Sequence, residues 1–209
     1  ISAPSANTSG RPSPTTAQHV EEDLTGKIDM IVDGGPVDIG VESSILDVTV
    51  DPPMILRPGA ITKEMFEGVV GTVAVDHTLI KPDSKEVPKA PGMKYRHYAP
   101  KAQLTVVEGD TDAVVNYINK RTAEHVANGM RAGIIATAET MEQYQAGDIK
   151  CIGTRADERT IAAGLFGVLR EFDSDGVNVI YSEAFQEEGI GSAIMNRLLK
   201  AAGHQVIHV

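Results

Sequence analysis

Hydroxyl side chains are crowded near the start of the chain, in a segment that also carries loop-forming prolines and a glycine. Over residues 3–15 the hydroxyls include those of Ser5, Ser9, Ser13 and Thr15. Asn7 and Gly10 favour turns, in which neighbouring backbone N–H groups converge on one point. Such a cluster of donors binds an anion such as phosphate with few positive charges. Composition alone favours a solvent-exposed Ser/Pro-rich connection.

Two further segments carry polar side chains next to expected strands. The apolar run 28–32 predicts a buried strand, a glycine-rich turn follows it, and a second strand is expected over 44–50, which places the Ser43 hydroxyl at a strand edge. An ordinary hairpin turn is the alternative. Arg57 interrupts the apolar run that begins at Ile55. It is either a surface side chain with its head in water or a buried guanidinium with an anionic partner.

Aromatic and cationic residues are interleaved in Lys94-Tyr95-Arg96-His97-Tyr98-Ala99-Pro100, within a stretch rich in proline and lysine. Side chains of these two kinds stack on a base and pair with phosphates. The alternative is a linker whose two tyrosines pack against a domain.

Several of these segments, in this order, resemble the threonylcarbamoyl-AMP synthase family in its longer, two-domain YrdC/YwlC form. The matching residues are Ala3-Pro4-Ser5-Ala6-Asn7, Ser9-Gly10, Pro12-Ser13-Pro14-Thr15, Gly26-Lys27-Ile28-Asp29, Asp33-Gly34-Gly35, Gly40-Val41-Glu42-Ser43, Leu56-Arg57-Pro58-Gly59, His97-Tyr98-Ala99-Pro100 and the segment 189–198. The resemblance covers nearly the whole chain. It departs from the family at Ser44, where a threonine is usual, and it implies that the first half of the YrdC-like domain is missing.

The resemblance implies a reaction and a set of ligands. The family joins L-threonine, bicarbonate and ATP into threonylcarbamoyl-AMP and pyrophosphate, for threonylcarbamoyl modification of a tRNA adenosine. It implies Mg²⁺ as the companion of ATP, held mainly by phosphates, and transfer partners in the tRNA-modification pathway. ATP would contact the backbone of Ala3 and the side chains of Ser5, Ser13, Arg57 and Tyr98, and threonine would contact Ser43. No residue is expected to act as a catalytic nucleophile or to ligate a metal, and the chain is expected to be inactive alone.

The composition of the chain limits the cellular compartment and the kinds of partner that are expected. The net charge is −10, and residues 76–102 hold the one basic stretch, with 6 basic and 3 acidic side chains. This pattern argues against strong direct binding of nucleic acid, because phosphate neutralisation dominates such affinity. The sequence shows no apolar span long enough for a bilayer. The single Cys151 is expected to be a buried structural thiol, and a cytoplasmic location follows.

The elements that must position these residues fall into three parts. Residues 1–75 are expected to be the C-terminal portion of a YrdC-like mixed α/β domain, with helices at 15–24 and 63–66 and strands at 28–32, 44–50 and 54–57. The segment 69–75 is either a strand or a turn. Thr62 is expected to cap the second helix. Residues 76–102 are expected to be an extended linker over the active site, since four prolines discourage regular structure.

From residue 103 to residue 209, strands and helices alternate. Strands are expected at 104–108, 131–137, 149–153, 177–182 and 205–209, and helices at 111–128, 141–144, 160–172 and 190–202. This alternation predicts a parallel sheet with helices on both faces, a Rossmann-like C-terminal domain.

Two other functions fit parts of the sequence. Residues 186–191 fit the Q-x-x-G-x-G pattern of acetyltransferases, which suggests an acyl-CoA-dependent transferase domain, although Glu187 and Glu188 would repel a pyrophosphate. A glycine-rich helix start is the simpler interpretation. The C-terminal domain is alternatively a non-catalytic regulatory or interaction module.

Overall fold

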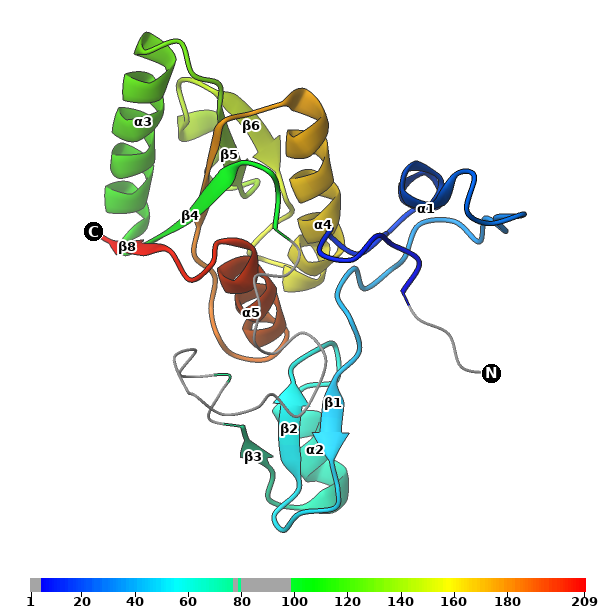
Figure 1. The fold of residues 1–209 in the computed structure, drawn as a ribbon. Coiled ribbons are helices and arrows are strands. Elements are labelled where there is room, and N and C mark those ends of the chain that lie inside the picture. The colour runs from blue at the N-terminus through cyan, green and yellow to red at the C-terminus, as the bar shows by residue number, and fades with distance from the viewer. Residues whose placement is uncertain (1–4, 77–78, 80–98) are drawn as a thin grey trace.

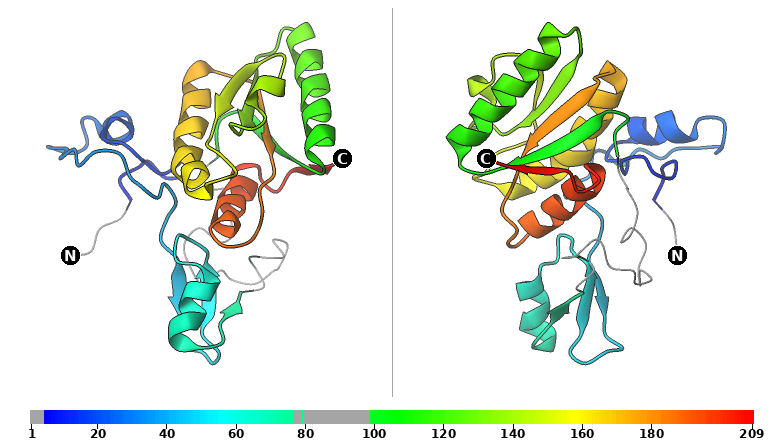
Figure 2. Two further views of the ribbon diagram at one scale, coloured as in Figure 1. Left: turned by 180° about the vertical axis from the view of Figure 1, so that it is seen from behind. Right: turned by 60° about the vertical axis from the view of Figure 1, so that its left-hand side comes forward.

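The chain forms two sheets that lie in two lobes (Figure 1). The computed structural model describes residues 5–76, 79 and 99–209. The larger sheet has the strand order β6-β5-β7-β4-β8, and the smaller sheet has the order β1-β2-β3. In all the views of Figures 1 and 2, helix α5 and the loop that leads into it are the part of the larger lobe that lies nearest the smaller sheet.

The larger sheet is parallel throughout, as the alternation of strands and helices predicts. Its strands are β4 (Gln103–Glu108), β5 (Ala132–Ala136), β6 (Asp148–Cys151), β7 (Val179–Glu183) and β8 (Val206–His208). Between them lie α3 (Thr111–Ala127), the 3₁₀ turn η2 (Met141–Gln143), α4 (Glu158–Asp175) and α5 (Gly191–Ala201). The mixed α/β fold and the parallel five-stranded sheet are therefore confirmed.

Helices cover both faces of this sheet because neighbouring residues along each strand point to opposite faces. Val106, Ile135 and Ile180 pack into the core that α4 and α5 complete. On each of these strands an adjacent residue points to the opposite face and packs into a second core, beneath α3. These residues are Val107, Ile134 and Tyr181. Figure 1 shows α3 and α4 on opposite sides of the sheet.

The smaller sheet joins β1 (Ile45–Asp47) to the antiparallel β2 (Met54–Arg57), with β3 (Ala74–Val75) parallel to β2. The strand expected over 44–50 is shortened because the Asp47 carboxylate accepts the backbone N–H and the hydroxyl of Thr49, which forms a turn. Helix α2 (Lys63–Val70) begins after Thr62, whose hydroxyl accepts the Met65 N–H at 3.5 Å. The expected cap is confirmed, and the helix is longer than expected.

The first helix, α1 (Ala17–Leu24), is present, but the buried strand expected over 28–32 is wrong. These residues form no strand, and Met30 and Val32 are 77% and 86% exposed. An apolar run becomes a strand only when a neighbouring strand pairs with its backbone. In the described part of the chain no strand lies beside this run.

The buried thiol expected at Cys151 is also wrong, because the side chain is exposed. Cys151 ends β6, which is the edge strand of the larger sheet, and only Asp148, Ile149 and Lys150 precede it there. The strand context was identified correctly, but an edge position leaves the side chain in contact with water.

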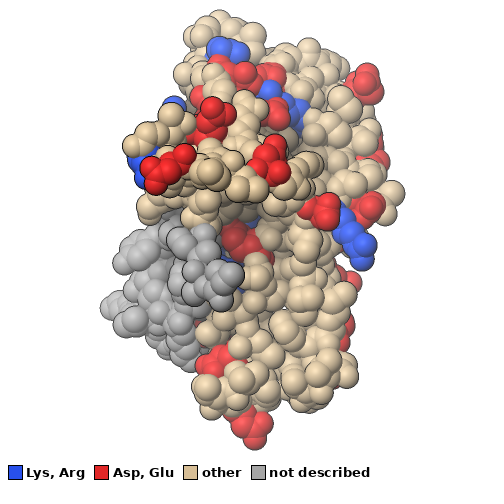
Figure 3. Space-filling model, turned by 90° about the vertical axis from the view of Figure 1, so that its right-hand side faces the viewer, with Lys and Arg blue, Asp and Glu red and all other residues tan. Residues whose placement is uncertain are grey.

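On the face in Figure 3, acidic side chains are distributed over the molecule and the basic ones do not gather into one patch. None of the helices in the described ranges combines the length and the hydropathy that a bilayer span requires.

Candidate functional site

Arg57 and Ser43 form a direct pair. Arg57 ends β2, and its Nε donates to the backbone carbonyl of Ser43 at 2.9 Å while its terminal nitrogen donates to the Ser43 hydroxyl at 3.2 Å. The expectation of a buried guanidinium with an anionic partner is therefore met only in part. The Arg57 side chain is half-buried, and it donates to a backbone carbonyl and to a hydroxyl. The two residues come from segments that precede β1 and end β2, which are antiparallel neighbours.

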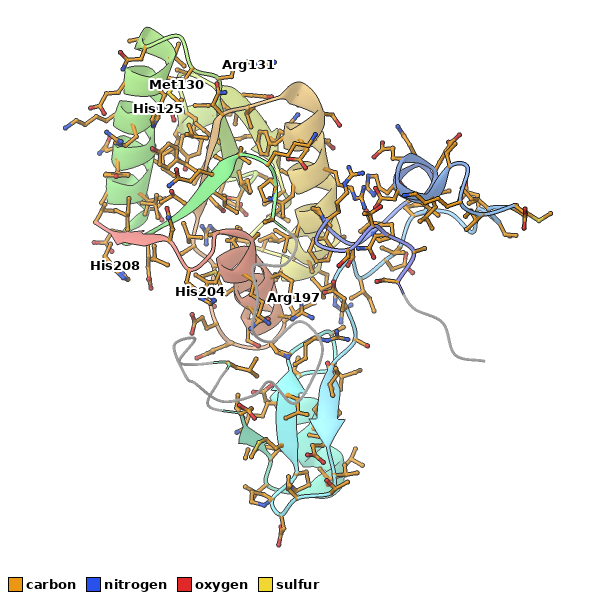
Figure 4. The ribbon with its side chains drawn as sticks, viewed as in Figure 1. His125, Met130, Arg131, Arg197, His204 and His208 are labelled. Carbon is orange, nitrogen blue, oxygen red and sulfur yellow. The ribbon has the colours of Figure 1, made fainter. Side chains whose placement is uncertain are left out.

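Ser13 joins the same group through Glu42. The Ser13 hydroxyl donates to one carboxylate oxygen of Glu42 at 2.5 Å, and Arg197 donates from Nε to the other at 2.9 Å. Arg197 projects from α5 toward the smaller lobe (Figure 4). Its remaining nitrogens donate to the backbone carbonyls of Pro58 at 2.6 Å and of Glu42 at 3.3 Å. The Glu42 and Pro58 segments thus meet on one guanidinium, and the Ser13 segment joins them through Glu42.

A second arginine of the larger lobe holds the hydroxyl-rich loop. Arg170 of α4 donates to the Pro12 carbonyl at 2.6 Å and to the Asp23 carboxylate at 2.9 Å. Asp23 also accepts the Thr8 N–H at 3.0 Å and pairs with Arg11. The loop from Thr8 to Ser13 is therefore fixed at both of its ends.

Gly40 lets the chain pass close to α4 before it reaches Glu42. Its φ is +73°, a left-handed conformation that favours glycine. A Cβ at this position would overlap the backbone of Ala162 and Ala163 in α4. This close approach positions the segment that carries Glu42 and Ser43.

The structure brings together three of the expected site residues, Ser13, Ser43 and Arg57. Ser5 is exposed and makes no hydrogen bond among the interactions found in residues 5–76, 79 and 99–209. Ala3 and Tyr98 lie outside the described residues. Asn7 donates to the carbonyls of Thr8 and Arg11, in keeping with a turn residue.

Sequence reasoning missed Glu42, Arg170 and Arg197. Arg197 lies one helical turn after the buried Ile194, and Arg170 comes directly after the buried Leu169. Each cation therefore interrupts the buried apolar face of its helix. A charged residue on the apolar stripe of a helix indicates a buried ion pair, and this signal was available. Their carboxylate partners lie 147 and 155 residues away, and no local pattern identifies them.

The charges shift one another's proton affinity. Burial would raise the pKa of Glu42, but the Arg197 charge and the Ser13 hydrogen bond outweigh it and lower that pKa. Lys200, one turn beyond Arg197 on α5, is only 4% exposed. Burial, followed by the nearby charges of Arg197 and Arg57, lowers the pKa of Lys200 to about 8.

This arrangement suits an anionic ligand better than a protein-held metal. Hydroxyls and a guanidinium supply donors for phosphate or carboxylate oxygens. The Glu42 carboxylate is already shared by Ser13 and Arg197. No group of three or more His, Cys, Asp or Glu side chains suited to a metal occurs among the residues that the structure describes.

The glycine-rich start of α5 is explained by packing. A Cβ on Gly191 would overlap the Gln186 carbonyl, so the helix start requires glycine for its own geometry. A cavity of about 390 Å³ beside it is lined by residues of both lobes, including Glu187, Glu188, Pro58 and Asn196. Two carboxylates at its wall disfavour the pyrophosphate that the acyl-CoA alternative requires.

Comparisons with known proteins match almost all of the chain. A family model described as "Threonylcarbamoyl-AMP synthase, C-terminal domain" matches residues 61–203, and one described as "Telomere recombination" matches residues 1–59. Proteins named threonylcarbamoyl-AMP synthase from Bacillus subtilis and Pyrococcus abyssi are 50% and 46% identical over 99% and 100% of this chain. The chain spans 58% and 59% of the length of these relatives.

A solved structure gives the same result. The crystal structure of P. abyssi Sua5 complexed with L-threonine superimposes with a TM-score of 0.89 at 44% identity, and the match covers 99% of this chain and 59% of the other. The comparisons do not bear out the separate expectation that the first half of the YrdC-like domain is missing.

Proposed function

This chain belongs to the threonylcarbamoyl-AMP synthase family, and we propose that it carries the nucleotide- and threonine-binding part of an L-threonylcarbamoyladenylate synthase. The reaction joins L-threonine, bicarbonate and ATP into threonylcarbamoyl-AMP and pyrophosphate. The observation that carries the proposal is the meeting of Ser13, Ser43 and Arg57 in a chain that matches proteins of that name over its whole length. We assign residues 1–75 to the catalytic domain, 76–102 to a linker over the site and 103–209 to the Rossmann-like domain.

The proposed chemistry needs no covalent intermediate with the protein. The threonine amine takes up bicarbonate with loss of water and becomes a carbamate. An oxygen of this carbamate attacks the α-phosphorus of ATP, and pyrophosphate leaves. Catalysis then depends on positioning and on stabilising negative charge. In this proposal Arg57 and the hydroxyls of Ser5 and Ser13 stabilise charge on the phosphate region. The backbone of Ala3 contacts the nucleotide, Tyr98 covers the nucleotide side of the pocket, and Ser43 orients the amino acid.

Mg²⁺ would arrive bound to ATP, because the donors of this site are hydroxyls and cations and the Glu42 carboxylate is occupied. The proposal further includes a cytoplasmic location, tRNA modification as the use of the product, and partners that receive it. Strong direct binding of nucleic acid is not expected, in view of the net charge of −10.

Two measurements test the function. The first is ATP binding by the 209-residue chain and by its Arg57→Ala and Ser5→Ala variants, with an exposed lysine variant, Lys120→Met, as the control. A hydrogen bond to a charged group is worth roughly 1.5–3 kcal/mol, so each site variant should lose about ten- to a hundredfold in affinity. Unchanged ATP affinity in both site variants would overturn the assignment.

The second measurement is threonine- and bicarbonate-dependent pyrophosphate release, with the Bacillus subtilis synthase as the positive control. We expect ATP binding by the chain but no turnover by the chain alone, and turnover by a gene product of the full length of the relatives. Equal turnover by both would contradict the claim that further residues are required.

A further inference from the structure

We infer that Arg197 is a positioning residue for this site: from the C-terminal domain it holds the segments of Ser13, Ser43 and Arg57 in one arrangement. This inference rests on the proposed function, and it assigns to the Rossmann-like domain a role that neither its fold nor its match to a family model supplies.

The contacts of Arg197 reach each of the three segments. Through Glu42 it reaches the Ser13 hydroxyl, since Glu42 accepts from Ser13 with one oxygen and from Arg197 with the other. Through the Glu42 carbonyl it holds the backbone beside Ser43. Through the Pro58 carbonyl it holds the backbone beside Arg57. One planar group therefore sets the distances among three segments that are far apart in sequence.

Arg197 acts through these segments rather than on a ligand. Its side chain is fully buried, and its Nε and both terminal nitrogens already donate to protein oxygens. Ser13 is half-buried and Ser43 is exposed, so these residues are more accessible to a ligand than the fully buried Arg197. Contact with the ligand is left to the residues that Arg197 places.

A lysine cannot replace this group. The contacts require donors that point in several directions from one rigid plane, and the Pro58 and Glu42 oxygens are reached by different nitrogens. A single ammonium has three donors on one atom and cannot reach such separated acceptors at once. Arg197→Lys should therefore behave like Arg197→Gln in nucleotide binding.

The test is a double-mutant cycle on ATP affinity. Removing Arg197 releases Glu42 and with it the Ser13 hydroxyl, so Arg197→Gln should weaken ATP binding by about tenfold in the wild-type background. In the Ser13→Ala background the same change should cost less, because one of the three segments that Arg197 holds has already lost its hydroxyl, while the contacts to the Glu42 and Pro58 carbonyls remain. In the Ser5→Ala background the two losses should multiply, since no contact links Ser5 to Arg197 in the described residues. Losses that multiply in both backgrounds would overturn the inference.

Two controls separate positioning from loss of folding. Glu42→Gln breaks the ion pair from the other side while it keeps an oxygen for Ser13, so it serves if Arg197→Gln fails to fold. Gly147→Ala disturbs the C-terminal domain on the side of α3, because a Cβ there would overlap the Ala132 carbonyl and the Thr122 side chain. It should leave ATP affinity unchanged. A loss of ATP affinity in Gly147→Ala equal to that in Arg197→Gln would reduce Arg197 to a general stabiliser and overturn the inference.

A readout that does not depend on ATP keeps this inference separate from the proposed function. Amide hydrogen exchange in residues 11–15 and 41–44 should speed up at least tenfold in Arg197→Gln and not in Gly147→Ala. If the wild-type chain binds no ATP, the proposed function fails while hydrogen exchange still decides whether Arg197 orders these segments. Unchanged exchange in both segments would overturn the inference.

Discussion

Lys200 is a buried cation whose charged form the fold disfavours. It is 4% exposed, and burial with the charges of Arg197 and Arg57 lowers its pKa from 10.5 to about 8. The charged form is thus disfavoured in the native state by about 3 kcal/mol. Because the native pKa is the lower one, the full penalty applies below pH 8. It is relieved as the pH rises through the interval between 8 and 10.5.

Replacing this lysine should therefore stabilise the protein in a pH-dependent way. Lys200→Met should unfold at higher urea than the wild type at pH 7, with the difference in free energy of unfolding shrinking toward pH 10. Urea unfolding at both pH values measures it, with Lys120→Met on the exposed side of α3 as the control. An advantage of the same size at both pH values would show that the ammonium is not the cause.

The glycines of α4 show how a helix accommodates the strands beneath it. A Cβ on Gly164 would overlap the Ile152 carbonyl, whereas a Cβ on Gly167 of the same helix meets nothing within 4 Å. Gly164→Ala should cost about 1–3 kcal/mol through overpacking. Gly167→Ala should gain about 0.5–1 kcal/mol because alanine is the better helix former. Thermal or urea unfolding compares the two, and equal effects of the same sign would contradict this account.

At the level of elements, the hydrophobic pattern of the sequence was sufficient to predict strands and helices whose buried face is defined by their own residues. The five strands and the helices of the C-terminal domain were predictable from their periodicity, since each strand and helix buries a face that its own residues define. The run 28–32 was not, because a strand needs a neighbour that no residue of the run specifies. Arg57 and Ser43 could be suspected from their neighbours, whereas Arg197 could be paired with Glu42 only in three dimensions.

At the scale of the whole molecule, a buried ion pair joins the N-terminal helix α1 to the larger lobe (Figure 1). Asp23 of α1 and Arg170 of α4 lie 147 residues apart and are both almost inaccessible. Burial would raise the pKa of Asp23, but hydrogen bonds from Arg170 and Thr8 lower it below 3.8. The carboxylate therefore stabilises the fold at neutral pH, and this contribution is lost as the pH falls through its native pKa.

Asp23→Asn should consequently destabilise the chain by about 3–5 kcal/mol at pH 7, since it leaves buried Arg170 without its full partner. Urea unfolding at pH 7 and at pH 3 measures the effect, which should diminish at the lower pH. Glu22→Gln is the matched control, because Glu22 approaches the same arginine at 3.6 Å but is 37% exposed. An equal loss in both variants would contradict the role of burial.

The uncovered stretch around Met30 and Val32 has a practical consequence for anyone who purifies this chain. Exposed apolar side chains on a backbone that pairs with no strand among the described residues favour association with a second molecule. Solubility should then depend on protein concentration, and light scattering should rise as the sample is concentrated. Charged replacements in this stretch would be the first remedy to try before crystallisation.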